Sequence, residues 1–188
     1  MMEKVSIRHT SKKDRAFLVS CLQDEETLLG FPLRGTSQEV KAATEYWMAF
    51  ADWQSSLTLL RNNIPCGIGT LFLEPYSKVN HHSEIGMIIA KPWRDRGLGT
   101  LLLAALFEYA KKEFSFEFLH LLVYAHNPAI SLYNRMGFRE FGRHSKWIKA
   151  GGVYKTCLFM ECPMKRFNQA NLLDLPKRTV PLPWEGEK

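Results

Sequence analysis

Short runs of apolar residues, several of them alternating with polar ones, recur along the chain at spacings that predict β-strands. Asn62-Asn63 and Gly151-Gly152 separate two pairs of these runs and indicate tight hairpin turns. The run Glu84–Ala90 is apolar almost throughout, which is typical of a central strand covered on both faces. The predicted strands are Val5–His9, Ser55–Arg61, Cys66–Glu74, Glu84–Ala90, Phe118–Ala125, Phe138–Lys149 and Val153–Glu161.

Apolar residues spaced three and four apart predict helices between these strands. The first is capped by Thr10 or Ser11 and runs to about Leu22. The other predicted helices are Ser37–Phe50, Leu98–Lys112 and Asn127–Met136. Leu98–Lys112 is apolar on nearly every side until Glu108, so we expect it to be well buried.

End signals support two of these helices. Thr36 or Ser37 caps the second, with Glu39 in its first turn. Asn127 suits the N-cap of the last, Pro128 its first turn and Gly137 the left-handed position after its end. Residues 24–35 contain Gly30, Pro32 and Gly35, and are predicted to form a loop.

The order of these elements predicts a single α/β domain of the layered α+β kind, with a mixed central sheet of six to seven strands and about four flanking helices. A length of 188 residues agrees with one domain. We expect the domain to span residues 1–162. Periodicity fades after that point, and four of the nine prolines lie there, so residues 163–188 are predicted to form a loosely held tail that packs on the body or on a partner.

Composition excludes several classes of protein. Hydrophobic residues make up 46% and charged residues 23%, enough apolar material for a real core. The longest strongly apolar run, Leu101–Phe107, is far shorter than the ~18 residues needed to cross a bilayer. The N-terminus lacks the apolar region of a secretory signal. The four cysteines form no CxxC pair, so we expect a cytoplasmic protein with no disulfide framework, no structural zinc and no membrane partner.

The formal net charge is +6, and most of it lies in one segment. The segment from Arg135 to Lys155 contains six basic residues and one acidic residue, Glu140. Such a cluster is usually a solvated face, but it also permits an anionic partner. Its aromatic residues fit strand packing better than nucleic-acid stacking. They are Phe138, Phe141, Trp147 and Tyr154.

The loop from Ala90 to Thr100 joins the apolar strand to the apolar helix. Gly97 and Gly99 allow a ligand to approach the backbone, and the free N–H groups at the helix start favour an anion. Arg94 and Arg96 add positive charge. The loop lacks the Gly-Lys-Ser/Thr of a Walker A sequence, and Leu102 stands where a dinucleotide fingerprint would have its third glycine.

Two motifs resemble those of one enzyme family. Arg94-x-x-Gly97-x-Gly99, after a strand and a proline, is similar to the acetyl-CoA loop of the GNAT superfamily of N-acetyltransferases. The stretch from Ala129 to Phe138, AISLYNRMGF, is similar to that family's A-I-x-L-Y-x-x-x-G-F motif. The resemblance covers about residues 84–159 and implies the GNAT fold, acetyl-CoA as co-substrate, no metal and direct transfer of the acetyl group to an amine.

The resemblance also implies which residues hold acetyl-CoA. Backbone groups of three strand residues would pair with the pantetheine arm, and main-chain N–H groups of the loop would wrap the pyrophosphate beside Arg94. The strand residues are Ile88, Ile89 and Ala90, and the loop residues are Asp95, Arg96, Gly97, Leu98, Gly99 and Thr100.

One position departs from the family pattern. The family commonly has Asn seven residues before the motif tyrosine, where this chain has His126. Asn127 stands one residue later. Either residue could contact the cofactor, and helix capping alone also explains Asn127.

Direct transfer needs a base for the amine and an acid for the leaving thiolate. By the resemblance, Glu84 is the candidate base and Tyr133 the candidate acid. A strand-entry glutamate paired with a surface cation and a core tyrosine are the alternative interpretations. His81 and His82 are secondary candidates for the base.

The acceptor is predicted only as a primary amine, on a small molecule or a protein N-terminus. Glu-Ile-Gly before the loop, together with the Gly-Gly hairpin, resembles the branch with spermidine, amino-acid and ribosomal-protein N-terminal acetyltransferases. Asp24, Glu25 and Glu26 are either a site for a cationic acceptor or a solvated loop.

A homodimer is possible by sequence. Two further readings stay open: a nucleic-acid-associated protein using the 135–155 cluster, although nucleic acid is not the expected partner, and a GNAT domain that binds acetyl-CoA without turnover.

Overall fold

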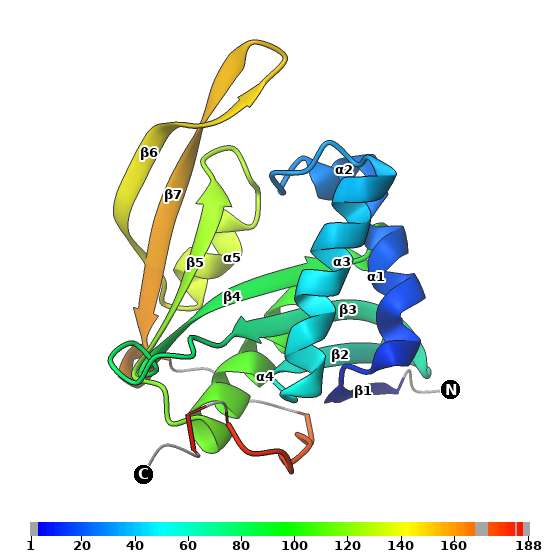
Figure 1. Cartoon of the computed structure of the whole chain (residues 1–188), viewed down its shortest axis with the longest axis vertical. Helices are drawn as coiled ribbons and strands as arrows, with labels where there is room; N and C mark the ends of the chain where they lie inside the picture. The colour runs from blue at the N-terminus through cyan, green and yellow to red at the C-terminus, as the bar shows by residue number, and fades with distance from the viewer. Residues whose placement is uncertain (1–3, 168–172, 183, 186–188) are drawn as a thin grey trace.

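The computed structural model describes residues 4–167, 173–182 and 184–185. One seven-stranded sheet runs through the molecule in the order β1-β2-β3-β4-β5-β7-β6 (Figure 1). Its strands are β1 (Val5–His9), β2 (Ser56–Arg61), β3 (Ile64–Phe72), β4 (His82–Ile89), β5 (Phe118–Tyr124), β6 (Arg139–Ala150) and β7 (Val153–Pro163). Glu84–Ala90 was expected to be a central strand, and β4 is the fourth strand of the sheet.

The two central strands, β4 and β5, are parallel and separate soon after they begin. They pair only through the first three residues of each, and the last pair is Glu84 with His120. On its other side, β4 stays paired with β3 as far as Ile89. Beyond Glu84, the edge of β4 that faces β5 is therefore open, and Figure 1 shows the two strands diverging.

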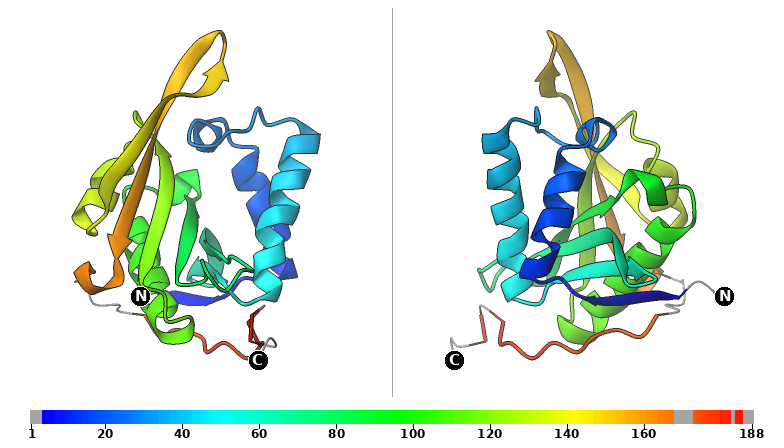
Figure 2. Two further views of the ribbon diagram at one scale, coloured as in Figure 1. Left: turned by 60° about the vertical axis from the view of Figure 1, so that its left-hand side comes forward. Right: turned by 90° about the vertical axis from the view of Figure 1, so that its right-hand side faces the viewer.

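Helices cover both faces of the sheet (Figure 2). On one face lie α1 (Arg15–Leu22), the short α2 (Glu25–Leu28) and α3 (Ser37–Asp52), and on the other lies α4 (Leu98–Glu113). The fifth helix, α5 (Ile130–Arg135), follows β5, and short 3-10 turns occupy Lys12–Asp14, Lys91–Trp93 and Met164–Arg166. The expected burial of α4 is confirmed, since nine of its residues are buried in the main core. In the part of the chain that is described, no helix is long and apolar enough to span a membrane.

Two helix starts differ from the sequence prediction. The segment expected to be a loop at residues 24–35 contains α2, because the Asp24 carboxylate accepts a hydrogen bond from the Thr27 N–H at 2.9 Å and starts a helical turn. The helix expected from Asn127 begins at Ile130. Asn127 still organises its entry, since its side-chain oxygen accepts from the Ala129 N–H at 2.9 Å.

The hairpin β6–β7 projects beyond the rest of the sheet (Figure 1). Gly151 and Gly152 have φ of 57° and 81°, the left-handed values that a tight hairpin turn of this type needs. Two of its aromatic residues, Phe141 and Trp147, pack across the strands against Phe159 of β7. Phe138 is fully buried, whereas Phe141, Trp147 and Tyr154 are 60%, 43% and 49% exposed because the distal hairpin has no helix over it.

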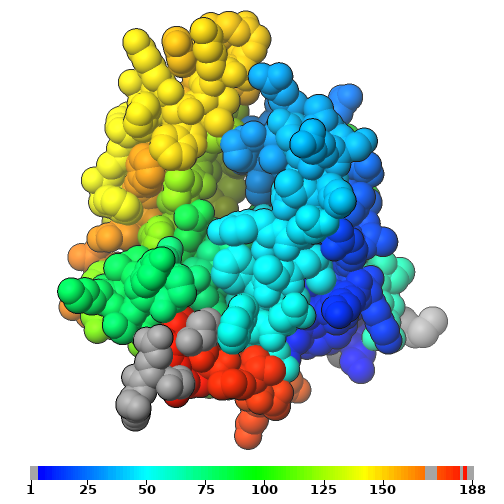
Figure 3. Space-filling model, viewed as in Figure 1, coloured from blue at the N-terminus to red at the C-terminus, as the bar shows by residue number. Residues whose placement is uncertain are grey.

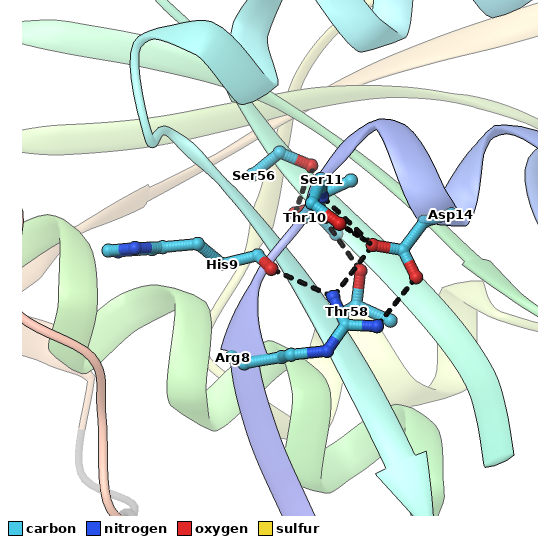
Figure 4. Close-up of polar contacts among 8 residues, drawn as sticks. Arg8, His9, Thr10, Ser11, Asp14, Ser56 and Thr58 are labelled. Carbon is cyan, nitrogen blue, oxygen red and sulfur yellow. Dashed lines mark hydrogen bonds and ion pairs between the residues drawn. The ribbon is translucent and has the colours of Figure 1, made fainter. Parts of the chain in front are cut away.

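A polar cluster fixes the junction between β1 and the first helical turn (Figure 4). Two nitrogens of the Arg8 guanidinium donate to the two carboxylate oxygens of Asp14 at 2.7 and 2.8 Å. The Ser11 N–H donates to the same carboxylate at 2.9 Å. Burial acts to raise the pKa of Asp14, but these hydrogen bonds outweigh it and the pKa is lowered. The buried carboxylate therefore stays ionised and holds the chain entering α1.

The described part of the C-terminal segment packs against the body (Figure 3). Leu182 is buried in the main core, and the guanidinium of Arg178 lies 5.5 Å from the ring centre of Phe114, just beyond α4. The Thr179 N–H donates to the side chain of Gln54 at 2.6 Å. Residues 173–182 therefore behave as a strap across the domain, and residues 168–172 lie outside the described part.

Candidate active site

A cavity of about 340 Å³ lies at the point where β4 and β5 separate. The loop after α2, one face of α3, both central strands, α5 and the β6–β7 hairpin each contribute to its wall. Its polar or ionisable lining residues are Tyr46, Glu84, Tyr124, Asn127, Tyr133 and Cys157. The cavity thus joins residues that are widely separated in the sequence, including both predicted catalytic residues.

Glu84 lies in the cavity wall, at the last residue of β4 that pairs with β5. It is partly buried, and its register partner on β3 is Phe72. Burial raises the pKa of the Glu84 carboxyl, and the nearby negative charge of Glu74 raises it further. A carboxylate with a raised pKa is a better proton acceptor than a solvated one, which suits a general base.

Tyr133 enters the cavity from α5. Its ring meets the buried ring of Phe138 edge-on at 5.7 Å between centres. Its carbonyl accepts from the Phe138 N–H at 3.0 Å, and the intervening Gly137 has φ of 102°, as its predicted role at the helix end requires. Burial raises the pKa of the Tyr133 phenol to about 12, so the phenol carries its proton at neutral pH.

The loop before α4 has the backbone shape expected of an anion site. Asp95 and Gly97 have φ of 58° and 76°, and Gly97 is the residue that caps α4. A side-chain carbon added at Gly99 would lie 3.4 Å from Leu132 of α5, so this glycine lets α4 and α5 approach closely. The first N–H groups of α4, from Leu98 to Thr100, have no helical carbonyl before them and lie at the loop, which fits a pyrophosphate.

Arg94, which the resemblance places beside the pyrophosphate, also has partners within the chain. Its side chain binds α2 and the end of β4. One guanidinium nitrogen donates to the Thr27 hydroxyl at 2.6 Å, another to Glu26 at 3.3 Å, and Nε donates to the Ile89 carbonyl at 3.0 Å. Asp24 lies 3.8 Å from the same guanidinium. Arg94 therefore connects the loop to α2.

The acidic run at residues 24–26 is explained by the same contacts. Glu26 also pairs with Lys91 at 2.7 Å, and the Asp24 carboxylate caps α2. Both carboxylates face cations of the loop at residues 90–100, which we call the phosphate loop. We name the contacts of Arg94 and Lys91 with Asp24, Glu26 and Thr27 the α2 latch.

Arg96 keeps a place beside the loop, and a second arginine joins it. The guanidinium of Arg96 lies 5.6 Å from the ring centre of Trp93, and that of Arg61 lies 5.1 Å from it. Arg61 ends β2, thirty-five residues before Arg96, and sequence reasoning missed it because no local signal connects the two positions.

The strand residues expected to meet the pantetheine arm divide into two groups. The Ala90 N–H donates to the Cys66 carbonyl of β3, and the Ala90 carbonyl accepts from the Trp93 N–H, so both backbone groups of Ala90 have partners within the chain. Ile88 is paired with Ile68 of β3. Because peptide groups alternate along a strand, those of Ile89 point to the open edge, where its carbonyl accepts from Arg94.

The structure separates the remaining candidates. Asn127 lines the cavity, whereas His126 is exposed and its ring stacks on Tyr124 at 5.9 Å. Neither His81 nor His82 is part of the described cavity wall. The ring of His82 lies 5.1 Å from that of His120 at the start of β4 and β5. Glu84 is therefore the candidate base that reaches the cavity.

Comparison with known proteins agrees with this geometry. Residues 23–138 match the acetyltransferase (GNAT) family. The chain belongs to this family. The match includes the α2 latch, the phosphate loop and α5, and the fold expected from the two motifs is confirmed as a GNAT-like α/β domain with a seven-stranded mixed sheet.

Individual GNAT relatives are distant. An L-amino acid N-acetyltransferase (AaaT) of Escherichia coli is 24% identical over 92 residues, which are 48% of this chain and 57% of that protein, so the match spans little more than half of the relative's length. A GNAT-family acetyltransferase of Streptococcus pneumoniae is 27% identical, with a TM-score of 0.70 over 85% of this chain and 99% of that one. A spermidine N-acetyltransferase of Vibrio cholerae, solved with CoA and spermine, has a TM-score of 0.74 at 16% identity, covering 86% of this chain and 96% of that one.

Proposed function

We propose that this GNAT protein transfers the acetyl group of acetyl-CoA directly to a primary amine, with Glu84 as general base and Tyr133 as general acid. The observation that carries the proposal is the meeting of these two residues in one cavity at the opening between β4 and β5. They come from different elements, and burial changes the pKa of each in a direction that suits its role.

An amine must be neutral to attack a thioester. An alkylamine with a pKa near that of lysine spends about 4–5 kcal/mol to lose its proton at pH 7, since each pKa unit costs about 1.36 kcal/mol. Glu84 accepts this proton, directly or through water, as the amine reaches the acetyl carbon. Glu84 is the last residue of β4 that pairs with β5, so it lies beside the open edge of β4.

The CoA thiolate leaves as the new C–N bond forms, and Tyr133 protonates it. With a pKa of about 12, the phenol is protonated across the physiological range and so holds the proton that the thiolate takes as it leaves. Asn127 lies in the same cavity wall, shortly before α5, and would bind the pantetheine arm. The alternative with His126 has no support from its exposed position.

Acetyl-CoA fits the residues present at the loop. The N–H groups of Asp95–Thr100 would bind the pyrophosphate, with Arg96 and Arg61 supplying positive charge nearby. Backbone groups at the open edge of β4, the N–H of Ile89 first, would pair with the pantetheine arm. Acetyl-CoA supplies the activated acyl group, and the chain supplies orientation and the two proton transfers.

Calorimetry with acetyl-CoA, followed by thiol release in the presence of amines, tests the proposal. We expect acetyl-CoA to bind and at least one amine to release CoA. The change Tyr133→Phe should lower kcat by about 10²–10⁴-fold, the range for loss of an acid–base group, while the Kd for acetyl-CoA stays within about threefold. Tyr76→Phe, at a 71% exposed tyrosine outside the cavity wall, is the matched control and should leave both values unchanged.

Two results would contradict the proposal. Failure to bind acetyl-CoA would rule out the proposed acetyl transfer. Full turnover by the Tyr133→Phe protein would rule out Tyr133 as the general acid.

A further inference from the structure

The wall of the cavity is dominated by aromatic rings. Seven of its residues are aromatic, one is a carboxylic acid, and none of the described lining residues is Lys, Arg or His. The aromatic residues are Phe31, Tyr46, Trp47, Phe72, Tyr124, Tyr133 and Trp147. A wall of this composition recognises flat apolar groups and offers a single charged contact, Glu84.

The rings are arranged on two sides of the cavity. On the α3 side, Tyr46 stacks on Phe72 at 5.3 Å between ring centres, and Trp47 meets Phe72 edge-on at 5.5 Å. On the hairpin side, Trp147 packs against Phe159 at 5.6 Å and is 43% exposed. Figure 3 shows the molecule hollowed between the hairpin and the helices that carry these two sides.

This wall disfavours a carboxylate on the acceptor. An acidic group inside it would have no cation to pair with, and it would meet the negative charge of Glu84. The two cations after the end of β4, Arg94 and Lys91, are held by the α2 latch. Free amino acids therefore fit this cavity poorly, whatever the substrate of a distant relative.

The same wall disfavours a polyamine. A polyamine needs several carboxylates, and Glu84 is the one carboxylate among the described lining residues. Glu74 is close enough to influence the pKa of Glu84, but it is exposed and outside the wall. On the projecting hairpin, Lys146, next to Trp147 in the sequence, and Lys149 lie 5.5 Å from the ring centre of Tyr154 and carry the same sign of charge as a polyamine.

Several buried polar atoms have no partner among the described residues, and one of them belongs to a residue of the cavity wall. It is the hydroxyl of Tyr124. A buried hydroxyl without a hydrogen bond is unfavourable, so a neutral polar group of a ligand that reached it would be stabilised there.

We propose that the acceptor is a small primary amine attached to an aromatic body that carries no carboxylate, an aralkylamine. This inference rests on the proposed function and specifies its substrate. The ring lies between the α3 side and Trp147, and the amine lies at Glu84. In the reaction the C–N bond forms and the thioester C–S bond breaks. The amine proton passes to Glu84 and the thiolate takes the phenol proton of Tyr133, so the products are the amide and free CoA.

The experiment compares matched amines with the same acetyl-CoA-loaded protein. The set is 2-phenylethylamine, phenylalanine, phenylalanine amide, a short peptide beginning with phenylalanine, and spermidine. Phenylalanine differs from 2-phenylethylamine by one carboxylate, and its amide removes that charge again. Rates of thiol release are expressed per neutral amine, because the amine pKa differs along the series.

We expect kcat/KM for 2-phenylethylamine to exceed that for phenylalanine by at least about tenfold, since the carboxylate is left unpaired. The amide should recover most of this loss. Comparable values for the peptide and the amide would mean that the same chemistry is taken from protein N-termini, and a much lower value for the peptide limits the acceptor to small amines. The first outcome would overturn the restriction to a small amine, and the second supports the proposal.

Paired variants on the hairpin test the aromatic contact. Trp147→Ala should raise the KM for 2-phenylethylamine by about tenfold, because one side of the ring site is lost, with the Kd for acetyl-CoA unchanged. Tyr154→Ala, on the same hairpin but outside the cavity wall, should leave that KM unchanged. An unaltered KM in the Trp147→Ala protein would contradict the inference.

The failures can be told apart. If acetyl-CoA does not bind, the proposed function fails and this inference fails with it. If acetyl-CoA binds and the best acceptor is phenylalanine or spermidine, the proposed function stands and the aralkylamine inference is overturned.

Discussion

Burial raises the pKa of both Glu84 and Tyr133, although one is proposed to accept a proton and the other to donate one. It raises the pKa of the Glu84 carboxyl, which makes that group a stronger base. It also raises the pKa of the Tyr133 phenol to about 12, which keeps that group protonated. One low-dielectric cavity can thus prepare both an acceptor and a donor of protons.

The raised pKa of Glu84 predicts how activity depends on pH. Because only the ionised carboxylate accepts a proton, kcat/KM should fall as the pH falls through this pKa. Glu84→Gln should lower kcat by about 10²–10⁴-fold and remove that acid limb. The measurement is the pH profile of kcat/KM with a saturating amount of acetyl-CoA.

Glu74→Gln supplies the matched control for this prediction. Removing the negative charge of Glu74 lowers the pKa of Glu84, so the acid limb should move to lower pH while the limiting rate is kept. An acid limb that stays in place in the Glu74→Gln protein and persists in the Glu84→Gln protein would assign the pH dependence to another group.

At the scale of elements, the α2 latch connects the phosphate loop with the wall of the cavity. Arg94 holds Thr27 and Glu26 of α2, and the chain leaving α2 supplies Gly30 and Phe31 to that wall. The loop that is expected to bind the cofactor therefore also positions one side of the acceptor site.

This connection predicts different effects for two arginines of one loop. Arg94→Gln should raise the KM of the acceptor amine several-fold more than it raises the Kd for acetyl-CoA, and should cost about 1–2 kcal/mol of stability through its lost hydrogen bonds. Arg96→Gln should mainly weaken acetyl-CoA. Arg94→Lys should restore part of the acceptor KM. Steady-state kinetics and calorimetry measure these values. A larger loss of acetyl-CoA affinity in Arg94→Gln than in Arg96→Gln would contradict the prediction and assign Arg94 to phosphate binding.

Most elements could be predicted because their ends carry strong local signals. The two glycines of the β6–β7 turn, Gly137 after α5 and the Thr36–Glu39 capping box of α3 all do in the structure what their types favour. The missed element, α2, has only four residues, and its cap is one aspartate in a stretch that contains turn-forming residues. Periodicity cannot detect a helix of a single turn.

At the scale of the whole molecule, the C-terminal segment links distant parts of the domain. Arg178 lies over Phe114 beyond the end of α4, and Thr179 bonds Gln54 beyond the end of α3. Leu182 enters the main core. We propose that residues 1–162 form the catalytic domain and that the segment within 163–188 braces the side of it farthest from the hairpin.

Leu182 provides the test of this bracing role. Leu182→Ala should lower the free energy of unfolding by about 2–3 kcal/mol, as expected for a buried leucine near the surface of a core. Lys177→Ala, at an exposed position of the same segment, is the control and should change stability by less than about 0.5 kcal/mol. Denaturant titration measures both, and equal stability of the two variants would show that the segment does not stabilise the domain.

The sequence by itself determined the family and the order of the strands and helices other than α2, and it pointed to Glu84 and Tyr133 as candidate site residues. These depend on local signals, because turn residues, caps and apolar periods act over a few positions. The tertiary structure decided which side chains share a site. It bound Arg94 to α2, brought Arg61 and Arg96 to the ring of Trp93, placed Asn127 rather than His126 in the cavity wall, and gathered aromatic residues from five helices and strands and one loop. Such contacts depend on how strands separate and helices pack, and positions far apart in the chain carry no mark of them.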